Sequence, residues 1–135
     1  HRDLHSFPTR RSSDLAKHAV RNGGIIVWLA ACSEGLGESH FEDWLTGHEK
    51  SEDMIEHIRR DFVLGGHKAA AIAMVLQNAR IFLVSDIDPN YVKGLFLEPF
   101  TDAQVAVDEA LRIMGSQSKL ILMPFGGSTL PKCSP

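Results

Sequence analysis

The sequence predicts an α/β fold with three layers, in which a mostly parallel sheet of about four strands is flanked by helices. Short apolar runs alternate along the chain with longer segments whose apolar residues recur at helical spacing. This alternation is typical of parallel strands joined by crossover helices. The first apolar run is continuous, as in a strand covered on both faces. The expected strands are residues 24–31, 80–85, 95–97 and 119–123.

The first half of the chain is expected to contain one strand and four helical segments. Residues 16–21 resemble the last turns of a helix, which Asn22 and Gly23 then end. A strand over 24–31 leads into a loop that contains two glycines, and a short helix over 38–45 follows. The last two helices are expected from Ser51, a good N-cap, to Gly65, and then over 67–78.

The second half is expected to begin with the strand over 80–85, followed by a turn-rich connection over residues 85–90. A short strand over 95–97 comes next. Residues 101–104 have the pattern of a capping box, which predicts a helix that begins there and ends near Met114. A last strand over 119–123 then leads into a glycine-containing loop.

Composition sets limits on the class of protein. The chain has 135 residues, 44% of them hydrophobic and 23% charged, which suits one globular domain. A formal charge of −3 argues against nucleic acid as the main partner. No apolar run reaches the roughly 20 residues of a membrane span. Two cysteines, Cys32 and Cys133, are too few for a disulfide framework, so we expect a cytoplasmic protein without a membrane partner.

Residues 1–15 stand apart from the rest of the chain, because they show no apolar periodicity. From His5 onward they resemble the conceptual translation of a sequencing adapter. We therefore expect residues 1–15 to be an artefact and residues 16–135 to be the native domain, whose natural beginning is missing. A basic arm around Arg10 and Arg11 is the alternative interpretation.

The loop after the first strand holds the first group of candidate site residues, which are Ser33, Glu34, Gly35 and Gly37. Ligands gather at the carboxyl ends of strands in open α/β sheets. The loop approximates a nucleophile elbow, but that chemistry needs a later acid and then a histidine, and no histidine follows His67. The glycines are equally compatible with an anion cradle and with a tight structural turn.

His67 and Lys68 form the second group of candidates. They follow a flexible glycine pair and place a titratable group and an amine at the start of a helix. A lysine there opposes the helix dipole, so an anion could compensate for it, although a solvated helix end explains the pattern as well. The spacing of His40, His48 and His57 does not place any pair on one helical face, so we predict no metal site.

Three stretches taken together resemble the C-terminal domain of the nickel-dependent lactate racemase family. Their order and spacing carry the resemblance, with Val84-Ser85-Asp86 between the second and the third. The stretches are residues 23–37, residues 62–69 (Phe-Val-Leu-Gly-Gly-His-Lys-Ala) and residues 123–131 (Met-Pro-Phe-Gly-Gly-Ser-Thr-Leu-Pro).

The resemblance implies a two-domain enzyme with its active site in the cleft between the domains. The family uses a nickel-pincer nucleotide, tethered to a lysine and ligated by a histidine, and interconverts 2-hydroxy acids by reversible hydride abstraction at the α-carbon. Paired histidines move the hydroxyl proton. These residues belong to the N-terminal domain, and the substrate-contacting glutamine and lysine are expected before Ala16. We therefore assign no catalytic residue and no metal ligand to this chain.

The expected function follows from these points. The chain would be part of a nickel-pincer-dependent racemase or epimerase of 2-hydroxy acids, with the two candidate groups meeting on one rim and its N-terminal domain as partner. By itself it would bind no cofactor. Some lactate-specific members place a tryptophan near the position of His67, so other 2-hydroxy acids stay open. The alternative function is a non-catalytic α/β module that binds a small anion.

Overall fold

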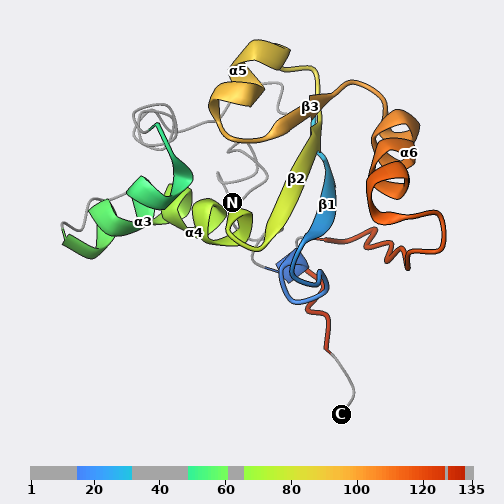
Figure 1. Cartoon of the computed structure of the whole chain (residues 1–135), viewed down its shortest axis with the longest axis horizontal. Helices are drawn as coiled ribbons and strands as arrows, with labels where there is room; N and C mark the ends of the chain where they lie inside the picture. The colour runs from blue at the N-terminus through green and yellow to red at the C-terminus, as the bar shows by residue number, and fades with distance from the viewer. Residues whose placement is uncertain (1–14, 32–48, 61–65, 127, 133–135) are drawn as a thin grey trace.

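A computed structural model describes residues 15–31, 49–60, 66–126 and 128–132 (Figure 1). The described elements alternate between strands and helices, as the sequence predicts. In chain order they are β1 (Gly24–Leu29), α3 (Ser51–Arg60), α4 (Gly66–Leu76), β2 (Ala79–Val84), α5 (Pro89–Gly94), β3 (Glu98–Phe100) and α6 (Ala103–Met114).

The three described strands form one parallel sheet in the order β1-β2-β3. Helices α3, α4 and α5 lie on one side of this sheet and α6 lies on the other (Figure 1). The arrangement confirms the predicted α/β class, with a parallel sheet flanked by helices in three layers. Because parallel strands all run the same way, their carboxyl ends lie at one common edge.

The main core lies between the sheet and helices α3, α4 and α5. Strand β2 is central, and its residues alternate between the two faces of the sheet. Ile81 and Leu83 point into this core and are 1% and 0% exposed. Trp28 of β1 lies in register with Leu83. The buried members of the cluster are Trp28, Ile55, Ile72, Ala73, Val75, Ile81, Leu83, Val92, Leu95 and Leu97.

The opposite face of the sheet is covered by α6, which packs mainly on β1. Phe82 of β2 is fully buried on this face, and its ring centroid lies 4.7 Å from that of Phe100. The guanidinium of Arg80 lies over the Phe82 ring at 5.3 Å and donates hydrogen bonds to Glu98. Ala106 of α6 is fully buried, so the helix approaches the sheet closely at that residue.

Some predicted boundaries are confirmed and others are displaced by one or two residues. The chain turns before β1 at Gly23, whose φ of +80° favours glycine, and α6 ends at Met114 as predicted. Strand β1 ends at Leu29 rather than residue 31, and α4 begins one residue before the predicted start. Helix α3 is described as far as Arg60, and its predicted end near Gly65 lies outside the described residues. The helix expected over 38–45 lies outside the described residues.

The connection after β2 differs from the prediction, because it contains a helix, α5, where we expected only turns. Residues 95–97, expected to be a strand, instead form the turn that leaves α5, and β3 follows at Glu98–Phe100. Leu95 and Leu97 are nonetheless buried. Their apolar pattern therefore indicated burial correctly and secondary structure incorrectly. Phe96 between them has a φ of +64°, uncommon for a residue other than glycine.

Two further predictions are wrong. Residues 119–123 do not form a strand, and Leu120, Ile121 and Leu122 are exposed. The predicted capping box over residues 101–104 does not form either. Asp102 rather than Thr101 is the N-cap of α6, and its carboxylate accepts a hydrogen bond from the amide of Val105 at 3.0 Å. The Gln104 side chain instead donates a hydrogen bond to the carboxylate of Asp108, one turn further along the helix.

Candidate functional site

The carboxyl edge of the sheet is the natural place for a site in this architecture. Leu29, Val84 and Phe100 lie in register across the three strands and end them. They form an apolar row on the α6 side of the sheet. Leu29 is 61% exposed, whereas Val84 and Phe100 are half-buried. The edge of the sheet at the candidate site is therefore apolar, and its Leu29 side chain on β1 is exposed.

Ser85 connects the ends of β2 and β3. Its amide donates a hydrogen bond to the carbonyl of Phe100 at 3.0 Å, which continues the strand pairing by one step. Its hydroxyl oxygen lies 3.4 Å from the amide of Ile87, a long contact for a hydrogen bond. Ser85 is buried, so its hydroxyl oxygen accepts this weak hydrogen bond within the turn, away from solvent.

Two aspartates stand where the chain leaves the sheet, and each caps a helix. Asp88 accepts hydrogen bonds from the amides of Asn90, at 2.8 Å, and Tyr91, at 3.4 Å, at the start of α5. Asp102 caps α6 in the same way. A carboxylate at a helix N-terminus is stabilised by the amides and by the helix dipole. Both groups therefore have structural partners at the edge where the candidate site lies.

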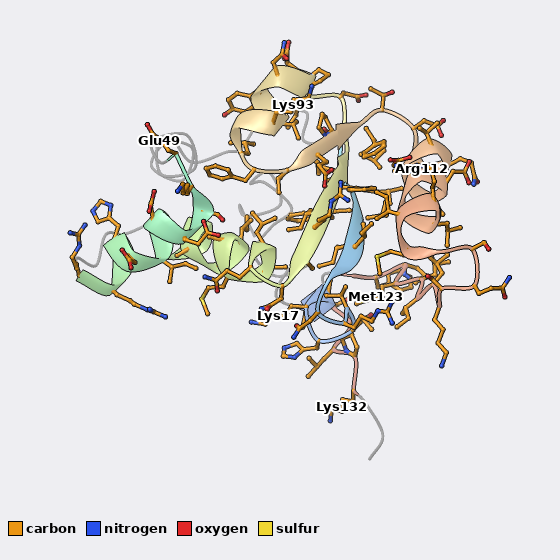
Figure 2. All side chains as sticks on the ribbon, viewed as in Figure 1. Lys17, Glu49, Lys93, Arg112, Met123 and Lys132 are labelled. Carbon is orange, nitrogen blue, oxygen red and sulfur yellow. The ribbon has the colours of Figure 1, made fainter. Side chains whose placement is uncertain are left out.

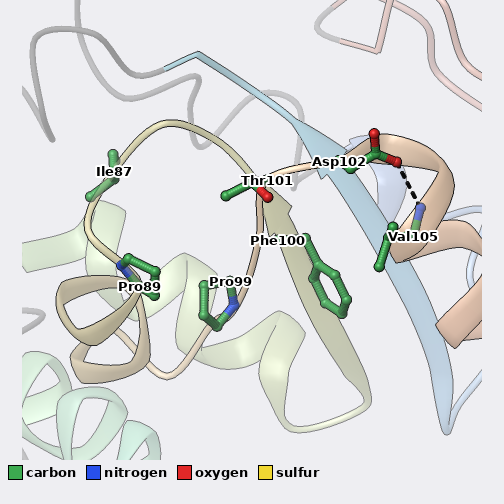
Figure 3. A pocket seen from close by; sticks show the side chains of 7 residues that line it. All are labelled: Ile87, Pro89, Pro99, Phe100, Thr101, Asp102 and Val105. Carbon is green, nitrogen blue, oxygen red and sulfur yellow. Dashed lines mark hydrogen bonds between the residues drawn. The ribbon is translucent and has the colours of Figure 1, made fainter.

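A pocket of about 230 Å³ lies between these two helix starts (Figure 3). It joins the loop after β2 to the end of β3 and the first turn of α6. Figure 3 shows Pro89 and Pro99 facing one another across it, with Phe100 and Thr101 on the strand side. The lining residues are Ile87, Pro89, Pro99, Phe100, Thr101, Asp102 and Val105.

The chemistry of this pocket is mostly apolar. Its side-chain polar groups are the Thr101 hydroxyl and the Asp102 carboxylate, and the carboxylate already accepts the Val105 amide. Such a lining suits a small group with an alkyl part and a hydroxyl. It contains no histidine, lysine or cysteine, so the pocket can bind and orient a ligand without supplying a strong general base.

The charged pairs on the α6 side lie apart from this pocket. Hydrogen bonding to Glu98 raises the pKa of Arg80. On α6, Arg112 donates to Glu109 at 2.8 and 2.6 Å, which lowers the pKa of Glu109 and raises that of Arg112. Figure 2 shows Arg112 on the outer helix layer. None of these four residues lines the pocket, so we interpret them as structural ion pairs.

The predicted site residues are placed only in part. Ser33, Glu34, Gly35 and Gly37 lie outside the described residues. The backbone of His67 and Lys68 forms part of the first turn of α4, which begins at Gly66, but their side chains are outside what the structure describes. The prediction that the two groups meet on one rim stays a prediction.

Sequence reasoning missed the pocket itself. The signal was present in part, because the turn-rich stretch over 85–90 follows a buried strand and contains Ile87 and Pro89. The contribution of Pro99, Phe100 and Val105 depended on the correct position of β3 and α6. Among the described residues, no three histidine, cysteine or acidic side chains are grouped as metal ligands would be. No helix in the described ranges is long and apolar enough to cross a membrane.

The family model for the lactate racemase C-terminal domain matches residues 7–130. The chain belongs to this family. The match begins inside the segment 1–15 that resembles adapter sequence, and it includes every described element. The lactate racemase of Thermoanaerobacterium thermosaccharolyticum is 27% identical over an alignment 133 residues long, and the alignment covers 95% of this chain and 31% of the relative.

A solved structure extends the likeness to the fold. The lactate racemase apoprotein from Thermoanaerobacterium thermosaccharolyticum superposes with a TM-score of 0.83 at 25% identity. The likeness covers 90% of this chain and 30% of that protein. This sequence therefore spans about a third of the length of the lactate racemase that it matches.

Proposed function

We propose that this chain is the C-terminal part of a racemase or epimerase that acts on lactate-type 2-hydroxy acids. Its carboxyl edge would supply one wall of an active site that the remainder of the enzyme completes. The observation that carries the proposal is the family match over residues 7–130, supported by the likeness of the fold to a lactate racemase. We expect the parent enzyme to work in the cytoplasm with the N-terminal domain as its partner.

The pocket is consistent with a wall of this kind. A volume of about 230 Å³ is below the usual range for drug-sized ligands, so it suits a small acid or part of one. The apolar lining would contact the alkyl group of the substrate, and the Thr101 hydroxyl could bond to its hydroxyl or carboxylate. The candidates Ser33, Glu34, Gly35, Gly37, His67 and Lys68 remain proposed substrate contacts from the neighbouring loops.

The cofactor of the family, a nickel-pincer nucleotide, would be held elsewhere in the parent enzyme. Its tethering lysine and ligating histidine are expected in the N-terminal domain, and among the described residues no three histidine, cysteine or acidic side chains are grouped as ligands of a metal ion would be. This chain would then bind and orient the substrate and exclude water from it.

The test uses the complete polypeptide that contains this sequence, loaded with its cofactor. Pure D-lactate, L-lactate and longer 2-hydroxy acids would be incubated with it, and each enantiomer would be measured by chiral chromatography. We expect at least one 2-hydroxy acid to reach an equal mixture of enantiomers, or the equilibrium mixture of epimers. An enzyme that leaves every 2-hydroxy acid unchanged would contradict the proposal.

The 135-residue chain alone should behave differently. We expect it to show no racemase activity and to bind less than one equivalent of nickel in equilibrium dialysis, because the histidine that ligates nickel and the lysine that tethers the cofactor are expected in the N-terminal domain. Stoichiometric nickel binding by the purified chain would show that the cofactor is wrongly assigned to the N-terminal domain. The complete polypeptide serves as the positive control.

A further inference from the structure

Exposed apolar side chains gather near the C-terminal end of the chain. Five of the eight large exposed hydrophobic residues in the described ranges lie between positions 120 and 130. They are Leu120 at 63%, Ile121 at 62%, Leu122 at 81%, Phe125 at 74% and Leu130 at 53% exposed. Concentrated apolar exposure of this kind is typical of an interaction site rather than of scattered surface residues.

The segment contains three consecutive apolar residues, Leu120, Ile121 and Leu122, all of which are exposed. Residues 118–123 have no helical or turn conformation. Leu120, Ile121 and Leu122 are 63%, 62% and 81% exposed. Three consecutive apolar side chains are therefore left without cover by the described part of the chain.

The backbone of the segment is also available. In the described part of the chain, residues 119–123 pair with no strand, and the sheet contains only β1, β2 and β3. A continuous apolar run with an unpaired backbone has the composition of a strand buried on both faces. The sequence therefore predicted a strand here for a sound physical reason, but none of the described strands pairs with it.

The segment leaves α6 in a defined direction. Gly115 ends that helix with a φ of +102°, and its amide donates to the carbonyl of Leu111 at 2.8 Å. The Ser118 hydroxyl donates to the carbonyl of Met114 at 2.8 Å. Figure 1 shows the chain then running away from α6 toward the C-terminus, and Figure 2 marks Met123 and Lys132 along it.

We propose that residues 119–123 form a strand of a sheet that belongs to the rest of the lactate racemase chain, outside this sequence. The occupant is argued from length, because this sequence spans only 31% of the racemase that it matches, which leaves a polypeptide large enough to cover the segment. The inference rests on the proposed function for the existence of that partner. The strand then joins the two parts of the enzyme.

Amide hydrogen exchange tests the pairing directly. It would be measured for residues 119–123 in the 135-residue chain and in the complete polypeptide that contains it. We expect these amides to exchange at least about a hundredfold more slowly in the complete polypeptide, because paired strands open only rarely. Equal rates in the two proteins would overturn the proposal, as would protection in the short chain that depends on its concentration, which would indicate a second copy.

Matched substitutions test the apolar part. Ile121→Asp and the control Met74→Asp both change an exposed side chain, at 62% and 53% exposure, and should leave the melting temperature of the short chain nearly unchanged. In the complete polypeptide only Ile121→Asp should lower it. Equal effects of both substitutions there would contradict the inference. Racemase activity is scored separately, so loss of the proposed function and loss of this pairing give distinguishable results.

Discussion

Replacing Phe82 by alanine should be among the most damaging single changes in this chain. Phe82 lies at the centre of the sheet, in register with Val27 of β1 and Glu98 of β3. It is fully buried on the face that α6 covers, and its ring packs against that of Phe100 at 4.7 Å. Truncation would remove a fully buried ring from the layer between the sheet and α6.

The size of the effect can be worked from these contacts. Removing a buried phenylalanine side chain costs about 3–5 kcal/mol, which includes the cavity that it leaves. The ring pair accounts for about 0.5–1.5 kcal/mol beyond area burial. We therefore expect Phe82→Ala to lower the free energy of unfolding by about 4 kcal/mol, a large share of the roughly 5–15 kcal/mol that stabilises a typical domain.

Urea unfolding followed by circular dichroism would measure this loss. Phe125→Ala is the matched control, because the same side chain is removed from a position that is 74% exposed, and it should change stability by less than about 0.5 kcal/mol. Phe82→Leu keeps most of the volume and should cost less than about 1.5 kcal/mol, so it remains measurable if the alanine variant does not fold. Similar losses for Phe82→Ala and Phe125→Ala would refute the assignment of Phe82 to the core.

Three further predictions concern the backbone, a helix cap and acid pH. Gly24→Ala should lower stability by more than about 1 kcal/mol, because an added Cβ would lie 2.5 Å from a methyl of Val20 and 2.9 Å from the carbonyl oxygen of Arg21. Gly94→Ala is the control and should not lower stability in this way, because nothing lies within 4 Å of the Cβ that it adds. Urea unfolding would measure both variants. Asp102→Ala should cost about 1 kcal/mol by the same assay, while Asp102→Asn retains the cap and most of the stability. Arg112 lowers the pKa of Glu109, so their pairing stabilises the fold at pH values above the ordinary pKa of 4.5, and this stabilisation is lost as the pH falls through the lowered pKa. The difference in unfolding free energy between the native chain and Glu109→Gln should therefore become smaller in acid. A difference that does not change with pH would contradict this prediction.

The fold class was predictable because it depends on the alternation of apolar runs with helical patterns. The apolar runs at residues 24–29 and 81–84 lie in neighbouring parallel strands, and their continuous apolar character is typical of buried strands. This apolar pattern is recognisable even when the exact ends of a strand are misplaced. The class of fold can therefore be predicted even where single elements are placed one or two residues away.

Helix α5 was missed for a specific reason. Asp88-Pro89-Asn90 is rich in turn-forming residues, but it also has an N-cap acid followed by proline at the first helical position. The six-residue helix has too few apolar residues to show helical periodicity. The turn that follows the helix then occupies residues 95–97, where the next strand was expected, so one missed helix displaced that strand.

The strand expected at residues 119–123 shows a different limit. The apolar run has the composition of a covered strand, but none of the described strands pairs with residues 119–123, whose leucine and isoleucine side chains are exposed. The N-cap of α6 shows a third limit. Thr101 and Asp102 are adjacent and both are good N-cap residues, so the sequence alone does not show which of the two caps the helix. The pocket depends on all of these elements together, which is why the sequence indicated the edge but not its lining.

The capping of α5 and α6 by Asp88 and Asp102 has a consequence for how an acid would be recognised here. Free amides at helix starts are a common way to hold a carboxylate. At this edge, side-chain oxygens of the same chain already accept hydrogen bonds from amides at both helix starts. A negatively charged ligand would therefore need cationic groups from other loops or from the N-terminal domain. The two capped helices would then shape the surface that the ligand contacts.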